Sequence, residues 1–114
     1  MTPFVLSLLL AAASLGIPPT ATLIGTQHLP CGAMLVYFDN DGSPENGPEY
    51  TAIMTEGADV PVMTVEYGAG DAGQFQRAII QLPGQPVEVY TSVEALMEHY
   101  SHPCDVVARV GVRT

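Results

Sequence analysis

Turn-forming residues divide this chain into short apolar segments, and this division constrains the fold more than any other feature of the sequence. The 114 residues include 11 glycines and 10 prolines. Asn, Asp, Gly and Pro crowd together most densely at residues 39–48, which we predict to be a loop. The apolar run before it, residues 33–38, is typical of a buried β-strand. A chain of this length predicts one domain, residues 1–114.

Capping signals and periodicity predict the order of helices and strands. A capping box begins at Asp71 and predicts a helix over residues 71–82. Another begins at Thr91 and predicts a helix over residues 91–100, with one apolar stripe. Strands are expected at residues 33–38, 49–56, 60–67, 87–90 and 104–113, and residues 21–24 are a further candidate for a short strand. This order predicts an α+β fold, a mostly antiparallel sheet of four to five strands with two to three helices packed on it.

The first sixteen residues are almost entirely apolar and allow two interpretations. In one, residues 1–16 form a helix that Thr2 and Pro3 begin and that Gly16 ends in a left-handed conformation. Such a helix is apolar on nearly every side, so it must be buried in the core or against another subunit. In the other, the segment is a secretory signal peptide. A signal peptide needs a positively charged start, and the first basic residue here is Arg77, so we favour the helix.

The charged residues are few and mostly acidic. Asp and Glu number 12 against 3 Arg, there is no Lys, and the formal net charge is -9. Because phosphate neutralisation needs Lys and Arg, a specific nucleic-acid-binding surface is excluded. The apolar stretch near the start, about 13 residues, is too short to span a bilayer, so we expect no membrane association.

Histidine and cysteine come close together at two places in the chain, His28 with Cys31 and His102 with Cys104. Structural zinc sites are often built from two close pairs of N and S ligands, so these four residues are candidate zinc ligands. A disulfide between Cys31 and Cys104 is a second alternative, and it requires an oxidising compartment. The spacing of His102 and Cys104 is tighter than structural zinc sites commonly use, and we expect two unpaired cysteines with no bound metal.

Two loops are similar to ligand-binding motifs but depart from them. The loop from Asp39 to Glu45 places oxygen ligands at alternate positions, as calcium loops do, yet its glycine is fourth rather than sixth and Tyr50 occupies the twelfth position. Residues 68–73 spell the glycine fingerprint of dinucleotide sites, but Asp71 puts a negative charge where a pyrophosphate would lie. Both are predicted to be ordinary turns. No carboxylates recur at a spacing suited to acid–base catalysis, so we expect no enzymatic activity and no cofactor.

A succession of short motifs runs through most of the chain. A Leu/Ala-rich segment ends in Leu-Gly at residues 8–16, and a Gly-x-x-x-Leu-Pro stretch follows at 25–30. An apolar strand ending in Tyr at 33–37 leads into a Gly/Pro-rich loop, and a Pro-x-x-x-Val strand follows at 61–67. This succession resembles the small tail-terminator and minor capsid, or head–tail joining, proteins of long-tailed phages. The chain departs from them in lacking lysine and in the helix expected at 91–100.

The resemblance implies a non-enzymatic virion protein that forms a homo-oligomeric ring and joins the tail tube to the neck, assembled in the host cytoplasm. A strongly negative ring lets DNA pass without holding it, because carboxylates repel phosphates. The surface expected to contact other subunits and neighbouring tail or neck proteins comprises Phe4, Leu8, Leu9, Asp39, Asp41 and Glu45. The alternative is a secreted or periplasmic small binding or inhibitor domain, with its signal peptide cleaved and Cys31 bridged to Cys104.

Overall fold

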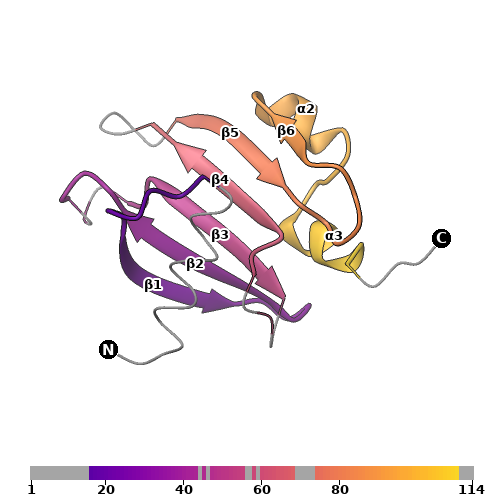
Figure 1. The fold of residues 1–114 in the computed structure, drawn as a ribbon, viewed down its shortest axis with the longest axis horizontal. Coiled ribbons are helices and arrows are strands. Elements are labelled where there is room, and N and C mark those ends of the chain that lie inside the picture. The colour runs from indigo at the N-terminus through magenta and orange to yellow at the C-terminus, as the bar shows by residue number, and fades with distance from the viewer. Residues whose placement is uncertain are drawn as a thin grey trace.

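The computed structural model describes residues 16–43, 45, 47–55, 58, 60–68 and 74–110, which form a six-stranded antiparallel sheet and two short helices (Figure 1). The strands are β1 (Thr22–His28), β2 (Ala33–Asp39), β3 (Tyr50–Thr55), β4 (Met63–Tyr67), β5 (Phe75–Ile80) and β6 (Glu88–Tyr90). Each strand pairs with the next one along the chain. The helices are α2 (Val93–Met97) and α3 (Pro103–Ala108). The predicted α+β class is confirmed, with more strands than expected.

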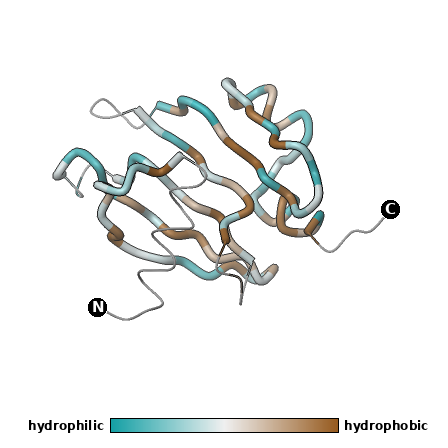
Figure 2. The backbone as a smooth tube through the Cα atoms, in the orientation of Figure 1, coloured by the Kyte–Doolittle hydropathy of each residue, from teal (hydrophilic) through white to brown (hydrophobic). Residues whose placement is uncertain are grey.

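The central strands carry apolar side chains on both faces of the sheet. In β2, Ala33 and Leu35 belong to one apolar cluster, and Val36 and Phe38 belong to another. Because alternate residues of a strand face opposite sides, one continuous apolar run supplies both clusters. Figure 2 shows this hydrophobic colouring along the inner strands and hydrophilic colouring at many of the turns. The first cluster includes residues of α2 and α3, and we call it the helix-side cluster.

Residues 75–80, predicted to be helical, form the strand β5 instead. Ala78 and Ile80 face the helix-side cluster, where each is fully buried. The spacing of apolar residues here fits a helix and a strand equally well, and the pairing of β5 with both β4 and β6 decides for the strand. The predicted start of this helix, Asp71, lies outside the described residues.

The predicted closing strand at residues 104–113 is also wrong over its described part, because residues 103–108 form the helix α3, and residues 111–113 lie outside the described residues. His102 caps this helix, since its Nδ1 accepts a hydrogen bond from the backbone N–H of Cys104 at 3.0 Å. Pro103 stands in the first turn, where its missing N–H removes no helical bond. Val106 is fully buried in the helix-side cluster and holds the helix against the sheet.

The helix predicted at 91–100 is shorter than expected and spans only Val93–Met97. Its cap is Ser92 rather than Thr91, and the Ser92 hydroxyl accepts a hydrogen bond from the backbone N–H of Ala95 at 3.1 Å. The apolar stripe is only partly used for packing, since Leu96 lies against the helix-side cluster while Met97 is 54% exposed.

A disulfide joins Cys31 to Cys104 across 73 positions of the sequence, with the two Cα atoms 5.9 Å apart. It ties the β1–β2 turn to the first turn of α3. The expectation of two unpaired cysteines is therefore wrong. The zinc alternative is wrong as well, because sulfurs bonded to one another do not serve as thiolate ligands.

The N-terminal segment lies mostly outside the described residues. This includes residues 1–15, and therefore the predicted helix, the alternative signal peptide and the expected interface residues Phe4, Leu8 and Leu9. The first described residue, Gly16, has a φ of 94°, which confirms the left-handed conformation expected at that position.

Candidate functional site

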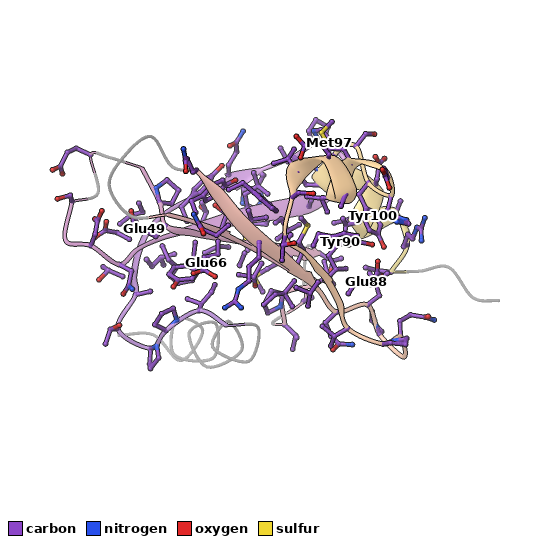
Figure 3. All side chains as sticks on the ribbon, turned by 90° about the horizontal axis from the view of Figure 1, so that it is seen from above. Glu49, Glu66, Glu88, Tyr90, Met97 and Tyr100 are labelled. Carbon is purple, nitrogen blue, oxygen red and sulfur yellow. A yellow bond between two sulfur atoms is a disulfide. The ribbon has the colours of Figure 1, made fainter. Side chains whose placement is uncertain are left out.

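Two regions of the structure are candidate binding sites. One is an acidic corner formed by Asp39, Asp41 and Glu49 at the turn between β2 and β3. The other is an apolar cavity between α2, the start of α3 and the sheet. Figure 3 shows the acidic residue Glu49 at one end of the molecule and the aromatic residues Tyr90 and Tyr100 of the helical end at the other.

The acidic corner is positioned by the ends of two paired strands. Asp39 is the last residue of β2, and Glu49 directly precedes β3. The backbone N–H of Glu49 donates to the carbonyl oxygen of Phe38 at 3.0 Å, which closes the loop at its base. As a result Asp39 and Glu49 are buried, with exposed fractions of 5% and 6%. The third carboxylate, Asp41, lies on the exposed side of the same turn.

Each carboxylate of the acidic corner accepts one hydrogen bond from a backbone N–H of the loop. The donors are Gly42 to Asp39 at 3.1 Å, Asn40 to Glu49 at 2.6 Å and Ser43 to Asp41 at 2.8 Å. The second oxygen of Asp39, Oδ1, is buried and has no hydrogen-bond partner. One carboxylate oxygen from each of the three residues lies within 4.8 Å of the others. Among the described residues, this is the group with the geometry to hold a metal ion.

The three carboxylates influence one another electrostatically. Burial raises the pKa of the Glu49 carboxyl, and the negative charges of Asp41 and Asp39 raise it further. The backbone N–H of Ser43 lowers the pKa of Asp41, because it stabilises the charged form. The corner therefore concentrates negative charge, and part of that charge is buried.

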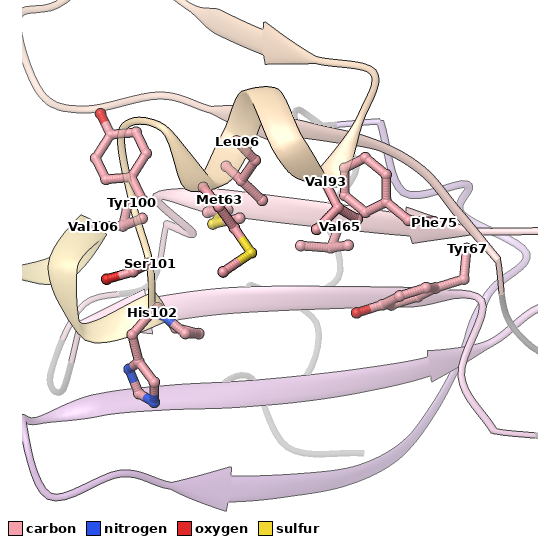
Figure 4. Close-up of a pocket in the computed structure, with 12 residues that line it drawn as sticks. Met63, Val65, Tyr67, Phe75, Val93, Leu96, Tyr100, Ser101, His102 and Val106 are labelled. Carbon is pink, nitrogen blue, oxygen red and sulfur yellow. The ribbon is translucent and has the colours of Figure 1, made fainter.

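The cavity, which we call the cap cavity, has a volume of about 310 Å³ and is mostly apolar (Figure 4). Its walls come from β4, β5, α2 and α3, and they include Met63, Val65, Phe75, Leu96 and Val106. The disulfide holds α3 in place next to it. Because α2 spans only Val93–Met97 and contributes no fully buried residue, it covers the sheet incompletely, and the cavity lies beneath it.

Polar groups line the cap cavity on two sides. Ser101 and His102 lie at one end, whereas Tyr67 lies on the opposite side of the cavity, near Phe75, with its hydroxyl pointing inward (Figure 4). The Ser101 hydroxyl is already engaged, since it donates to Asp105 at 2.8 Å. His102 accepts through Nδ1, so in the neutral imidazole Nε2 carries the proton and serves as a donor. Burial raises the pKa of the Tyr67 phenol, which keeps it a neutral donor.

A second polar group at the helical end holds the structure together. The hydroxyls of Tyr90 and Tyr100 both donate to the Glu88 carboxylate, at 2.6 Å and 3.0 Å. The guanidinium of Arg109 lies 5.0 Å from the centre of the Tyr100 ring. These contacts join β6 to the segments around α2 and α3, and their geometry is that of a structural anchor.

The residues predicted to form a functional surface are only partly brought together. Asp39 and Asp41 lie in one cluster, whereas Glu45 is exposed on the loop between them and Glu49. Glu49 itself was missed, although its place directly after the loop signal was visible in the sequence. The cap cavity was missed too, because its walls come from segments that sequence patterns do not place next to each other.

Comparison of the chain with protein-family models, curated proteins and solved structures found no match in any of the three. None of the described helices has the length and hydrophobicity needed to cross a membrane.

Proposed function

We propose that this chain is a small binding domain of an oxidising compartment, secreted or periplasmic, whose cap cavity receives an apolar group of its ligand. The observation that carries the proposal is the disulfide between Cys31 and Cys104. Disulfides persist in oxidising compartments and are rare in the cytosol, where thiols are kept reduced. Both cysteines of the chain are used in this bond.

The cap cavity favours one class of ligand. Its volume of about 310 Å³ is at the lower end of the range of small-molecule sites, roughly 300–1,000 Å³. Apolar walls favour an aliphatic or aromatic group, and the donors that Tyr67 and His102 contribute to the lining favour a hydrogen-bond acceptor on that group. A net charge of -9 opposes an anionic ligand. The chemistry therefore fits a small uncharged molecule, or an apolar side chain of a partner, that carries a hydrogen-bond acceptor.

The compartment is tested by the intact mass of the protein recovered from its natural host. A mass that corresponds to a start near Ile17 and to an oxidised cysteine pair supports the proposal. A mass that retains Phe4, together with two free thiols, contradicts it. The thiols are counted by alkylation before and after reduction in denaturant.

The cavity is tested with a neutral apolar dye, Nile red, and a matched pair of variants. Leu96→Trp fills the cavity, because Leu96 is one of its walls. Val89→Trp adds the same side chain on β6, where Val89 is 56% exposed and does not line the cavity. We expect saturable dye fluorescence with the natural chain and with Val89→Trp, and its loss with Leu96→Trp. Equal dye binding by all three folded proteins would contradict a role for this cavity.

The virion role remains a second proposal, and one feature of the sheet supports it. The outer edge of β1 pairs with no described strand, and its seven residues contain no Asp, Glu, Lys or Arg. Unpaired, uncharged edge strands are the places where sheets add further strands from other chains. A ring built in this way predicts a homo-oligomer, which light scattering after size exclusion detects. A protein that stays monomeric when concentrated and is recovered with its first sixteen residues removed contradicts it.

A further inference from the structure

We propose that the acidic corner is a calcium-binding site, in which Asp39, Asp41 and Glu49 each supply a carboxylate oxygen. The first observation is the unpartnered oxygen of Asp39. This side chain is 5% exposed, and its Oδ1 is buried without a hydrogen bond. Buried carboxylate oxygens are normally paired or coordinated, because an unpaired one loses its hydration without compensation. A cation placed among the three carboxylates provides that compensation.

Within the described residues, no Lys or Arg side chain provides it. The chain has no lysine, and the two arginines that the structure describes are engaged elsewhere. Arg77 forms an ion pair with Glu66 at 2.7 Å, and Arg109 lies over the Tyr100 ring. The described part of the chain therefore leaves three converging carboxylates with only backbone N–H donors beside them.

The carboxylate ligands suit calcium, and they suit the smaller magnesium ion less well because magnesium requires a more regular geometry. Calcium–oxygen distances are about 2.3–2.6 Å, so two ligands on opposite sides of the ion are up to about 5 Å apart. The three carboxylate oxygens here lie within 4.8 Å of one another, so they reach one calcium ion with little movement. Magnesium needs about 2.0–2.1 Å and near-ideal octahedral geometry, which calcium does not. Oxygen ligands alone also disfavour zinc and copper.

The surroundings of the corner suit a bound ion. One oxygen of each carboxylate accepts a backbone N–H, which orients the side chain much as outer-shell partners orient the ligands of metal sites. A hollow of about 390 Å³, lined by Asn40, Glu49 and Glu66 among others, lies beside the corner. It reaches the corner on the Glu49 side, where it leaves room for waters among the six to eight ligands that calcium takes.

This site differs from the calcium loop considered in the sequence. That motif requires a glutamate at the twelfth position of one loop, which Tyr50 occupies here. Glu49 instead reaches the cluster because the pairing of β2 with β3 brings the two ends of the loop together. The proposal does not depend on the proposed compartment, since calcium binding is measured on the isolated chain. With three carboxylates and otherwise water or carbonyl ligands, we expect a dissociation constant of about 10⁻⁴–10⁻³ M.

The test is calcium binding by the full chain after treatment with a chelator. Calcium at ten times its dissociation constant is expected to raise the midpoint of thermal unfolding by about 5 °C, and magnesium at the same concentration by much less. Asp39→Asn and Glu49→Gln are expected to abolish the calcium shift. The matched control is Glu94→Gln, which removes the same charge from the exposed surface of α2 and is expected to keep the full shift.

A second measurement keeps the test valid if a variant folds poorly. Tyr50 lines the same hollow as Glu49, so terbium bound at the corner is expected to luminesce when the protein's tyrosines are excited, and calcium is expected to displace it. Tyr50→Phe is expected to weaken the luminescence while leaving the calcium shift intact. No calcium shift in the natural chain, or an equal shift in Asp39→Asn, would overturn the proposal. A shift reproduced by sodium chloride of the same ionic strength would overturn it too.

Discussion

The acidic corner and the helical cap, which comprises α2, α3 and the residues around them up to Arg109, are organised by opposite principles (Figure 3). The corner brings like charges together within one short stretch of chain, residues 39–49. The cap brings apolar and aromatic groups together from segments far apart, and a disulfide across 73 positions secures it. Burial and the disulfide stabilise the helical cap, whereas the acidic corner stabilises the fold only when a cation neutralises its carboxylates. The cap is therefore a stabilising element, and the corner has the character of a binding site.

Removing the disulfide is expected to have the largest effect. In the double variant Cys31→Ala with Cys104→Ala, the unfolded chain regains the freedom of a loop that spans 73 positions. The free energy of unfolding is then expected to fall by about 4 kcal/mol. Urea unfolding monitored by circular dichroism measures it. An unchanged midpoint would mean that the bond does not secure the cap.

Truncation of the cap core is expected to have the next largest effect. Val106 is fully buried between α3 and the sheet, and Val106→Ala leaves a cavity there. We expect a loss of about 2 kcal/mol in the free energy of unfolding. Val93→Ala is the matched control, because Val93 is 40% exposed and its truncation is expected to cost less than about 1 kcal/mol. Equal losses would show that the cap is not packed as the structure has it.

A substitution in the acidic corner is expected to raise the free energy of unfolding, whereas the substitutions in the helical cap lower it. In calcium-free buffer, Asp39→Asn removes a buried negative charge and gives the neighbouring carboxylates an N–H donor. We expect the free energy of unfolding to rise by about 1.5 kcal/mol. Urea unfolding in the presence of a chelator checks this. A clear loss of stability would mean that the three carboxylates are already compensated without an ion.

Removal of the N-cap hydrogen bond of α2 is expected to have a smaller effect. It distinguishes the roles of two adjacent residues, Thr91 and Ser92. Ser92→Ala removes the acceptor for the Ala95 N–H and is expected to cost about 1 kcal/mol. Thr91→Ala is expected to change the free energy of unfolding by less than about 0.5 kcal/mol, because Thr91 is exposed and does not cap the helix. A larger loss of stability with Thr91→Ala than with Ser92→Ala would instead support the capping box predicted at Thr91.

The smallest expected effect is a dependence on alkaline pH at the helical cap. Burial, together with the hydrogen bond to Glu88, raises the pKa of Tyr90 to about 12. In the unfolded chain the pKa is about 10, so the unfolded state loses this proton first as the pH rises. Stability is therefore full below about pH 10 and falls as the pH approaches 12. Urea midpoints between pH 8 and 11 are expected to fall less steeply in Tyr90→Phe than in the natural chain.

The sequence predicted most strands but not every element. The strands at residues 33–38, 49–56, 60–67 and 87–90 are confirmed, because apolar runs bounded by turn residues are unambiguous there. The apolar residues at 75–80 fit the periodicity of a helix and also that of a strand, and only the pairing with β4 and β6 decided for the strand. In the last segment, alternating apolar residues predicted a strand, whereas the structure forms a helix that His102 caps and that has Pro103 in its first turn.

The candidate sites, like the secondary structure, could be predicted from the sequence only in part. Asp39 and Asp41 were visible as a loop signal, yet Glu49 became their neighbour only when β2 paired with β3. The two cysteines were expected to be unpaired, with a disulfide and a zinc site as alternatives, because spacing along the chain does not give the distance between Cα atoms. The 5.9 Å separation of those atoms is a property of the folded sheet and α3.

By itself, the sequence determined most of the turns, the apolar strands, the acidic character and the scarcity of basic residues, because each depends on residue type and local spacing. The tertiary structure decided the state of Cys31 and Cys104, the strand β5, the helix α3, the cap cavity and the convergence of the three carboxylates. The physical reason is that these features depend on contacts between segments far apart in the chain. Such contacts outweigh local preferences of about 1 kcal/mol or less per residue.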